Sequence, residues 1–225
     1  MVRALLDILL PPRCALCASP QEPLCRECLA GLPYLAGPSC SRCGRPTALP
    51  ADECRECGGR RLGFQRAAAA LAYEGGGREL VRHLKSGRRR ALAAPAGATI
   101  ATLLEAGQSE AVCWVPGDWW RTIQRGCHPA ELLAREAAFR WGLPAVDLLE
   151  PARLRRPQRG LDTAARRRNV RGAFRVRRAV EVPARVALVD DVYTTGATLD
   201  ACARALRDGG AAVVQGFTLA RAVRW

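Results

Sequence analysis

Residues 186–198 decide the fold class of this chain, and they read Val186-Ala187-Leu188-Val189-Asp190-Asp191-Val192-Tyr193-Thr194-Thr195-Gly196-Ala197-Thr198. The four apolar residues at the start are typical of a strand that is buried on both faces of a parallel sheet. Two carboxylates, a loop of threonine and glycine, and the beginning of a helix follow. In an open α/β sheet, ligands bind at the carboxyl ends of the strands, so this stretch also predicts where a site lies.

The loop formed by Thr194, Thr195, Gly196, Ala197 and Thr198 leads into a helix N-terminus. Hydroxyls and backbone N–H groups in that position favour a bound phosphate. The neighbouring Asp190 and Asp191 would repel a phosphate unless they face another group. Ribose hydroxyls suit them, because an ionised carboxylate accepts hydrogen bonds from both O–H groups. The pattern therefore predicts a phosphate beside a diol. The alternative is a capped helix after a core strand, with both acids merely solvated.

The rest of the chain beyond residue 62 alternates between strand-like and helix-like patterns. Strands are expected over residues 66–73, 111–116, 186–189 and 212–220. Helices are expected from about residue 78, in a second stretch ending at 105, and over 129–141 and 199–206, with a turn at 75–77. Strands that alternate with helices imply a parallel α/β sheet.

Eight of the chain's 11 cysteines form four Cys-x-x-Cys pairs in the first quarter: Cys14 and Cys17, Cys25 and Cys28, Cys40 and Cys43, Cys54 and Cys57. Two thiolates on one tight turn point at the same ion, and two such turns complete a tetrahedral S4 site. We therefore expect two structural Zn²⁺ ions. Adjacent pairs can share an ion. In the cross-braced alternative, the first and third pairs share one ion and the second and fourth pairs share the other. The sequence leaves this pairing open.

Disulfides and a redox relay are the alternatives to zinc. Disulfides need an oxidising compartment. Residues 1–10 are apolar, but Asp7 interrupts them and Pro11-Pro12 follows in place of a small-residue cleavage site. We interpret them as a short amphipathic helix, not as a signal peptide, and we expect a cytoplasmic location. A redox relay usually sits in a βαβ context.

The segment before residue 63 has too few large apolar residues for a core of its own. Metal binding must therefore supply most of its folding free energy, roughly 10 kcal/mol per site. The sequence predicts two units, a helix plus zinc module over 1–62 and an α/β domain over 63–225.

The chain is strongly basic, with 35 Lys+Arg against 21 Asp+Glu and a formal net charge of +14. This charge favours phosphate or nucleic-acid partners. The chain's one lysine is Lys85, and a compact ammonium is not equivalent to a guanidinium. Lys85 is therefore a candidate for binding pyrophosphate, although one retained lysine in a single sequence can also arise by chance. No apolar run approaches the roughly 18 residues needed to span a bilayer.

Residues 186–198 resemble the fingerprint of the type I phosphoribosyltransferases, in which four apolar residues and two acids precede a Thr/Gly loop. The resemblance implies that Asp190 and Asp191 contact the ribose 2- and 3-hydroxyls of phosphoribosyl pyrophosphate and that residues 194–198 hold its 5-phosphate. It also implies that the loop at 116–128 binds pyrophosphate, with Arg121 and Arg125 neutralising its charge.

Further motifs narrow the resemblance to the ComF (competence protein F) family: Leu84-Lys85, Val115-Pro116, Arg125-Gly126, Pro157-Gln158 and Gly172-Ala173-Phe174, together with the cysteine-rich start. The resemblance covers essentially the whole chain. It implies a double zinc ribbon, a phosphoribosyltransferase-like domain that binds phosphoribosyl pyrophosphate with Mg²⁺, and a role in DNA uptake or DNA use. Where the family often has Gly-Phe-Asn-Gln, this chain has Gly126-Cys127-His128-Pro129. A role for amide side chains there is in doubt; His128 is a candidate donor or a surface residue at a helix start.

Two functions follow as hypotheses. One is a phosphoribosyltransferase that transfers phosphoribose with release of pyrophosphate. The other is a non-enzymatic accessory that handles single-stranded DNA or binds a helicase-like partner. Arginine fills 11 of 26 positions from Arg153 to Arg178, which fits a hood over pyrophosphate, a nucleic-acid surface or a solvated loop. Trp119 and Trp120 either stack on bases or pack their loop. A redox-sensitive zinc switch is a third, weaker hypothesis.

Overall fold

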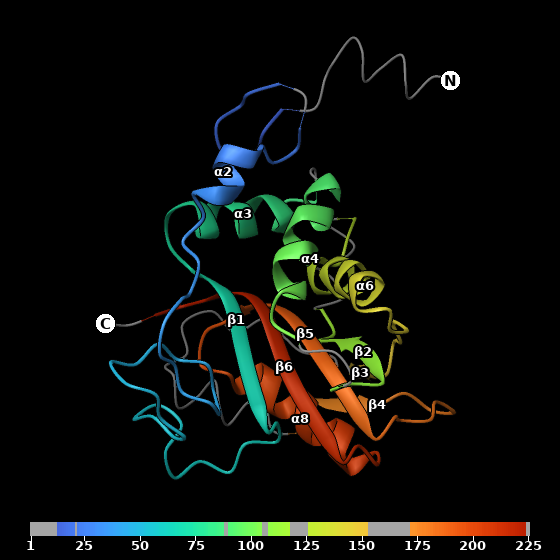
Figure 1. The fold of residues 1–225 in the computed structure, drawn as a ribbon. Helices are drawn as coiled ribbons and strands as arrows, with labels where there is room; N and C mark the ends of the chain where they lie inside the picture. Colours follow the sequence, from blue (N-terminus) through green and yellow to red (C-terminus); the bar gives the residue numbers. More distant parts are fainter. Residues whose placement is uncertain are drawn as a thin grey trace.

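The computed structural model describes residues 13–20, 22–87, 90–104, 108–117, 126–152 and 172–223. Its centre is a four-stranded sheet in the order β1-β6-β5-β2 (Figure 1). The strands are β1 (Arg66–Ala72), β2 (Ala111–Trp114), β5 (Arg185–Tyr193) and β6 (Val213–Arg221). Each neighbouring pair is parallel, as expected from the alternation of strands and helices.

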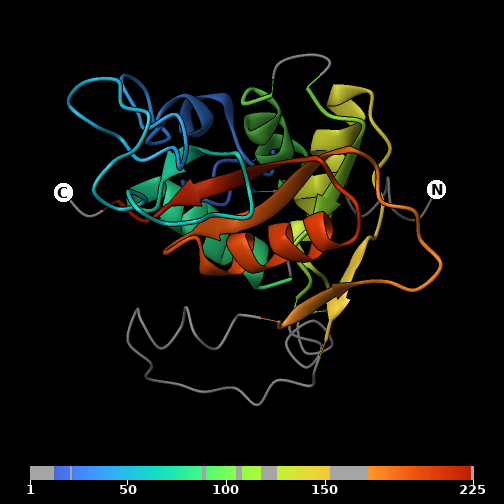
Figure 2. The ribbon, with the colours of Figure 1, turned by 90° about the horizontal axis from the view of Figure 1, so that it is seen from below.

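Helices cover both faces of this sheet (Figure 2). One face carries α3 (Gly75–Lys85), the short 3-10 helix η1 (Arg90–Leu92), α4 (Ala93–Ala101) and α6 (Pro129–Trp141). The other face carries α8 (Ala197–Asp208) and a small antiparallel pair, β3 (Leu149–Pro151) with β4 (Phe174–Val176). The α/β prediction is confirmed.

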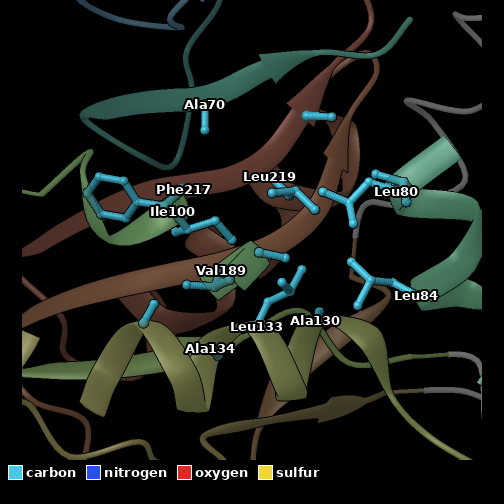
Figure 3. Packing of buried hydrophobic residues seen from close by; sticks show 14 of the residues in the cluster. Ala70, Leu80, Leu84, Ile100, Ala130, Leu133, Ala134, Val189, Phe217 and Leu219 are labelled. Atoms are coloured by element: carbon cyan, nitrogen blue, oxygen red, sulfur yellow. The ribbon is translucent and has the colours of Figure 1, made fainter. Parts of the chain in front are cut away.

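The core lies on both sides of the two central strands. On the first face, Val189 and Phe217 pack with Leu133 and Leu84, all at most 2% exposed (Figure 3). On the second face, Leu188 belongs to a cluster with residues of α8. Each such side chain contributes about 1.5–3 kcal/mol when it leaves water. Burial on both faces explains the uninterrupted apolar run of β5, which follows the exposed Arg185.

Several element boundaries differ from the sequence-based expectation, and three of the differences bear on the site or its packing. Strand β5 continues through both acids to Tyr193, because β6 supplies a pairing partner as far as Arg221. Helix α8 begins at Ala197, two residues early. The turn expected at 75–77 is instead the first turn of α3. A Cβ at Gly77 would lie 2.4 Å from the carbonyl oxygen of Ala72, so close packing accounts for glycine there despite its cost of about 1 kcal/mol in a helix.

The cysteine-rich segment packs along the outer edge of β1. Leu35 N donates to Ala70 O at 2.8 Å, and Ala72 N donates to Pro33 O at 2.8 Å. Further along, Ala67 N donates to the carbonyl oxygen of Arg42 at 2.9 Å. These bonds satisfy backbone groups that an edge strand would otherwise expose. The segment also contains the short helix α2 (Arg26–Ala30).

The helix expected over residues 1–10 lies outside the described residues. Within the part of the chain that the structure describes, no helix has both the length and the apolar character needed to cross a membrane.

Candidate functional site

The carboxyl end of β5 and the start of α8 form the candidate ligand site. The chain turns at Thr194, Thr195 and Gly196, and Gly196 is the N-cap of α8 with a φ of 70°. The N–H of Ala197 donates to Thr195 Oγ1 at 3.4 Å. A small cleft with a cavity volume of about 20 Å³ opens here, lined by Asp190, Val192, Tyr193, Thr194, Gly196, Ala197, Thr198, Leu199 and Thr218. The phosphate loop expected from the sequence therefore borders a hollow at the strand end.

The two acids occupy different electrostatic environments. Asp190 is partly buried, and its Oδ1 accepts from the N–H of Asp191 at 2.8 Å. Burial and, second, the like charge of Asp191 together raise the pKa of Asp190 to about 8, against the lowering effects of that hydrogen bond and of Lys85. Asp190 thus holds a proton near neutral pH in the unliganded protein. A cation or a hydroxyl donor in the cleft would favour its ionised form.

Lys85 meets the second acid at this site. It is the last residue of α3, and its Nζ lies 2.9 Å from Oδ1 of Asp191. The lysine side chain is 34% exposed and the aspartate 17%, so the ion pair is only partly shielded from solvent. The sequence singled out Lys85 by its rarity alone, and the structure places it beside the acid pair.

Gly196 cannot be replaced by another residue without strain. Its positive φ is one that side-chain-bearing residues adopt at a cost of roughly 1–2 kcal/mol. A Cβ on Gly196 would also lie 2.2 Å from the hydroxyl oxygen of Tyr193. The phosphate loop is therefore closed tightly over the ring of Tyr193, which is 3% exposed.

Several residues expected at the site lie outside the described residues: Arg121, Arg125, Trp119, Trp120 and the arginine-rich stretch from 153 to 171. His128 is described and is the N-cap of α6, where its Nδ1 accepts from the N–H of Glu131 at 3.0 Å. The departure from the family pattern at 127–129 thus forms a capped helix start, with Pro129 at the first position of the helix.

The eight paired cysteines form two clusters of four. Cys14, Cys17, Cys25 and Cys28 make the first, and Cys40, Cys43, Cys54 and Cys57 make the second, with all sulfurs of a cluster within 4.8 Å of one another. Adjacent pairs therefore share a site, and the cross-braced alternative is not the arrangement adopted. All eleven cysteines lie within the described residues, and none of them forms a disulfide there.

The sulfur spacing tests whether zinc fits. Four sulfurs about 2.3 Å from one ion stand about 3.8 Å apart at the corners of a tetrahedron. In the second cluster the Sγ atoms of Cys40 and Cys57 are 3.5 Å apart, and those of Cys54 and Cys57 are 3.8 Å apart. In the first cluster Cys17 and Cys25 are separated by 3.7 Å. Both clusters thus have the donor set and the size of a tetrahedral Zn²⁺ site.

The first cluster contains a thiol prepared for metal binding. Burial opposes ionisation of Cys14, but backbone N–H groups of Cys25, Cys17 and Leu16 lower its pKa to about 6. A thiolate is the form that binds zinc. All four cysteines of the second cluster are buried, whereas two of the first are partly buried and Cys17 is exposed.

Three residues near the site were missed by the sequence analysis. Thr218 pairs with Asp190 across the sheet and lines the cleft. Tyr193 lies under the phosphate loop, and Arg221 is a buried cation against its ring. Arg221 directly follows the strand expected over 212–220, and a charge at the end of that mostly apolar stretch is the signal that would have found it.

Comparison with known proteins agrees with this arrangement. Residues 5–58 match the family described as double zinc ribbon domain. The DNA utilization protein YhgH of Salmonella typhimurium is 32% identical over 191 residues, covering 81% of this chain and 83% of that protein. Competence protein F of Haemophilus influenzae is 37% identical over 116 residues, 50% of this chain and 51% of that protein. Competence protein ComFC of Streptococcus pneumoniae is 33% identical over 103 residues, 45% and 43% of the two chains.

Two solved structures also align with part of the chain. One is described as the allosteric regulatory enzyme of purine biosynthesis, with a TM-score of 0.39 and 24% identity over 60% of this chain and 25% of that chain. The other is the glutamine phosphoribosylpyrophosphate amidotransferase from B. subtilis, with a TM-score of 0.38 and 25% identity over 59% and 26%. The alignments span about a quarter of those longer chains.

Fold and site define the class of protein. It is an α/β protein with a four-stranded parallel sheet, preceded by a cysteine-rich double zinc ribbon with two four-cysteine metal sites. The chain belongs to the ComF family.

Proposed function

We propose that this chain binds phosphoribosyl pyrophosphate with Mg²⁺ at the carboxyl end of β5. The observation that carries the proposal is the meeting of three features in one place. Two carboxylates, a Thr/Gly loop at a helix N-terminus and the Nζ of Lys85 all border the same strand end. A ligand that carries a phosphate, a diol and a second anionic group matches these features in charge and in hydrogen-bonding capacity.

Each part of the ligand has its own partners in this proposal. The 5-phosphate accepts from the N–H groups and hydroxyls of residues 194–198, where each charge-assisted bond is worth roughly 1.5–3 kcal/mol. The ribose hydroxyls donate to Asp190 and Asp191. The pyrophosphate faces Lys85, and Arg121 and Arg125 stay predictions for the same role.

The acids also suit the cation that accompanies the ligand. Carboxylate oxygens are the protein ligands that Mg²⁺ prefers. Asp190 is protonated near neutral pH only while no cation shares the cleft, because its raised pKa of about 8 stems from burial and from the charge of Asp191. A divalent cation that arrives with the ligand would favour ionisation of both acids.

The reaction that fits such a site is phosphoribosyl transfer. An acceptor nucleophile forms a bond to C1 of the ribose, the C1–O bond to pyrophosphate breaks, and pyrophosphate leaves with the electron pair. Positive charge develops on the ribose ring, where Asp190 and Asp191 stabilise it. Catalysis of this kind rests on positioning and electrostatics.

A ligand series tests the proposal. Phosphoribosyl pyrophosphate, ribose 5-phosphate and pyrophosphate are titrated separately by calorimetry into the zinc-loaded protein with Mg²⁺. We expect the tightest binding for phosphoribosyl pyrophosphate, weaker binding for ribose 5-phosphate, and loss of both when Thr198 is replaced by Val. Equal affinity for pyrophosphate alone and for the full ligand would contradict the assignment, because the acid pair and the loop would then contribute nothing.

A role in handling DNA is the second candidate, and the names of the relatives favour it. Proteins similar to this chain are called DNA utilization and competence proteins, and this chain carries a net charge of +14. We propose single-stranded DNA or a helicase-like protein as the partner. Anisotropy titrations with a labelled oligonucleotide at 50 and 200 mM salt test it. An affinity that falls by a factor of about 10³ or more indicates several phosphate contacts; no binding at 50 mM removes DNA as a partner.

A further inference from the structure

Arg221, the last residue of β6, joins the second zinc cluster to the ligand site. Its side chain is 1% exposed. Its guanidinium donates to the carbonyl oxygen of Cys43 at 2.6 Å and lies 3.9 Å from the Sγ of that residue. It also forms an ion pair with Glu56 at 2.9 Å. Both partners belong to the second cluster or lie between its ligands.

The same guanidinium supports the phosphate loop from below. Arg221 stacks on the ring of Tyr193 at 4.1 Å from its centroid. The two residues are also paired across β5 and β6, and Ala222 N donates to Tyr193 O at 2.9 Å. The ring of Tyr193 in turn fills the space beneath Gly196, where a Cβ would lie 2.2 Å from the hydroxyl oxygen. A continuous chain of contacts therefore runs from the cluster to the loop.

The charges along this chain of contacts depend on one another. A buried guanidinium is costly unless it is paired and hydrogen-bonded. The ion pair with Glu56 and the hydrogen bond to the carbonyl oxygen of Cys43 meet this requirement for Arg221. Four thiolates with one Zn²⁺ carry a net charge of −2, so a metal-loaded second cluster balances Arg221 and fixes Cys43 as its acceptor.

The second cluster is also held rigidly against the sheet. The backbone bond from Ala67 N to Arg42 O lies next to Cys43. Gly44 has a φ of 69°, and a Cβ there would lie 2.5 Å from Ala67 O. The first cluster docks elsewhere: Leu16 and Leu32, which flank its ligands, pack against Gly76 at the start of α3.

We propose that Arg221 and Tyr193 are positioning residues that couple metal binding at the second cluster to ligand binding at the phosphate loop. Zinc held by Cys40, Cys43, Cys54 and Cys57 orders the Arg221–Tyr193 stack, and the stack holds the loop in its ligand-binding form. By linkage, a ligand on the loop raises the zinc affinity of the second cluster by the same factor. The coupling to ligand binding rests on the proposed function, whereas the ordering of the loop by the Arg221–Tyr193 stack does not.

Amide hydrogen exchange tests the effect on the loop in the zinc-loaded, unliganded full chain. We expect exchange in residues 194–198 to be at least fivefold faster in Tyr193→Leu and in Arg221→Met. Tyr193→Phe should exchange like wild type, because the Tyr193 hydroxyl has no hydrogen-bond partner among the described residues. Arg135→Met is the matched control, since Arg135 also combines an ion pair, with Glu131, and a cation–π contact, with Trp114.

A loop that stays protected in Tyr193→Leu overturns the proposal. Amide exchange that is accelerated as much in α6 as in the loop also overturns the proposal, because it would show that the two residues contribute only to general stability. If Arg221→Met does not fold, Arg221→Lys replaces it; the ammonium keeps the charge but cannot both stack and bridge Cys43 and Glu56, so it should also loosen the loop.

Cobalt substitution tests the coupling itself. With Co²⁺ in the zinc sites, ribose 5-phosphate should shift the thiolate-to-metal absorption of the wild-type second cluster and tighten Co²⁺ binding about fivefold or more, within the usual range for coupled sites. The shift should vanish in Tyr193→Leu. If ribose 5-phosphate binds with no change at the metal, the coupling is overturned. If it does not bind, the proposed function fails, and the exchange result alone decides the positioning role.

Discussion

The Nζ of Lys85 and the Oδ1 of Asp191 are 2.9 Å apart, although 106 positions separate them in the sequence (191 − 85). Helix α3 places the lysine at its C-terminal end, and β5 brings the acid to the same edge of the sheet. The pair fixes one carboxylate of the site through the chain's one lysine. Lys85 thus places a positive charge beside the acid pair, where it would attract an anionic ligand.

Replacing Lys85 tests this arrangement. Lys85→Met should weaken phosphoribosyl pyrophosphate binding by about tenfold or more, because a charge-assisted bond is worth roughly 1.5–3 kcal/mol. Stability should change little, since a partly exposed ion pair contributes about 0–1 kcal/mol. Calorimetry and thermal melting measure the two effects. Arg82→Met, on the same helix and paired with Glu79, is the control and should bind normally; equal losses in both variants would contradict a specific role for Lys85.

The raised pKa of Asp190 gives stability a particular pH dependence. Its pKa is about 8 in the folded protein and about 3.9 in the unfolded chain. The folded state therefore holds an extra proton between these values. The stability from this group is fully present below about pH 4 and is lost as the pH rises through about 8.

Replacing Asp190 with asparagine, an amide of the same shape, removes this loss of stability at high pH. Asp190→Asn should melt at a higher temperature than wild type, and the gap should widen from pH 6.5 to pH 9 in the zinc-loaded, unliganded protein. Melting curves across that range provide the measurement. If the melting temperatures of the two proteins change in parallel with pH, the pKa of Asp190 is not raised.

Replacing two glycines that have nearly the same φ angle distinguishes the cost of backbone strain from the cost of a steric clash. Gly196 and Gly142 have φ values of 70° and 65°, and a Cβ at Gly142 would have no neighbour within 4 Å. Gly142→Ala should cost about 1–2 kcal/mol from the backbone alone. Gly196→Ala should cost roughly 1–3 kcal/mol more, because the Cβ displaces Tyr193, and should abolish ligand binding. Denaturant unfolding compares them; equal costs would mean that the ring does not support the loop.

Metal content distinguishes the two possible pairings of the cysteine motifs. Because Cys14 and Cys25 belong to one cluster and Cys40 to the other, Cys14→Ser with Cys25→Ser should remove one zinc ion from the chain. Cys14→Ser with Cys40→Ser should remove two. Native mass spectrometry counts the ions. A cross-braced arrangement predicts the reverse for both double variants.

Much of the site could be predicted from the sequence because its chemistry is local. The apolar run, the acids and the Thr/Gly loop are contiguous, so their order alone places Asp190, Asp191 and residues 194–198 at a strand end. The zinc sites were predictable for the same reason. Lys85 was found only through its rarity, since no local pattern reports that the end of α3 meets β5.

The rest depends on contacts between distant segments. Arg221 lies 178 positions from Cys43, and its burial makes sense only once the second cluster is folded against β1. Strand β5 extends past its apolar run because β6 pairs with it as far as Tyr193. Strands β3 and β4 are three residues each, too short for a two-residue period to stand out.

The central claim is that the acid pair and the loop bind phosphoribosyl pyrophosphate. The most direct measurement is calorimetric titration of that ligand, with Mg²⁺ at physiological salt, into the zinc-loaded wild type and into Asp190→Asn, Asp191→Asn. Both proteins are first shown to be folded by amide exchange of α6 and to contain two zinc ions. We predict micromolar binding by the wild type and no measurable binding by the variant. Equal binding by the two proteins would place the ligand elsewhere, and no binding by the wild type would leave the DNA-handling role as the better account.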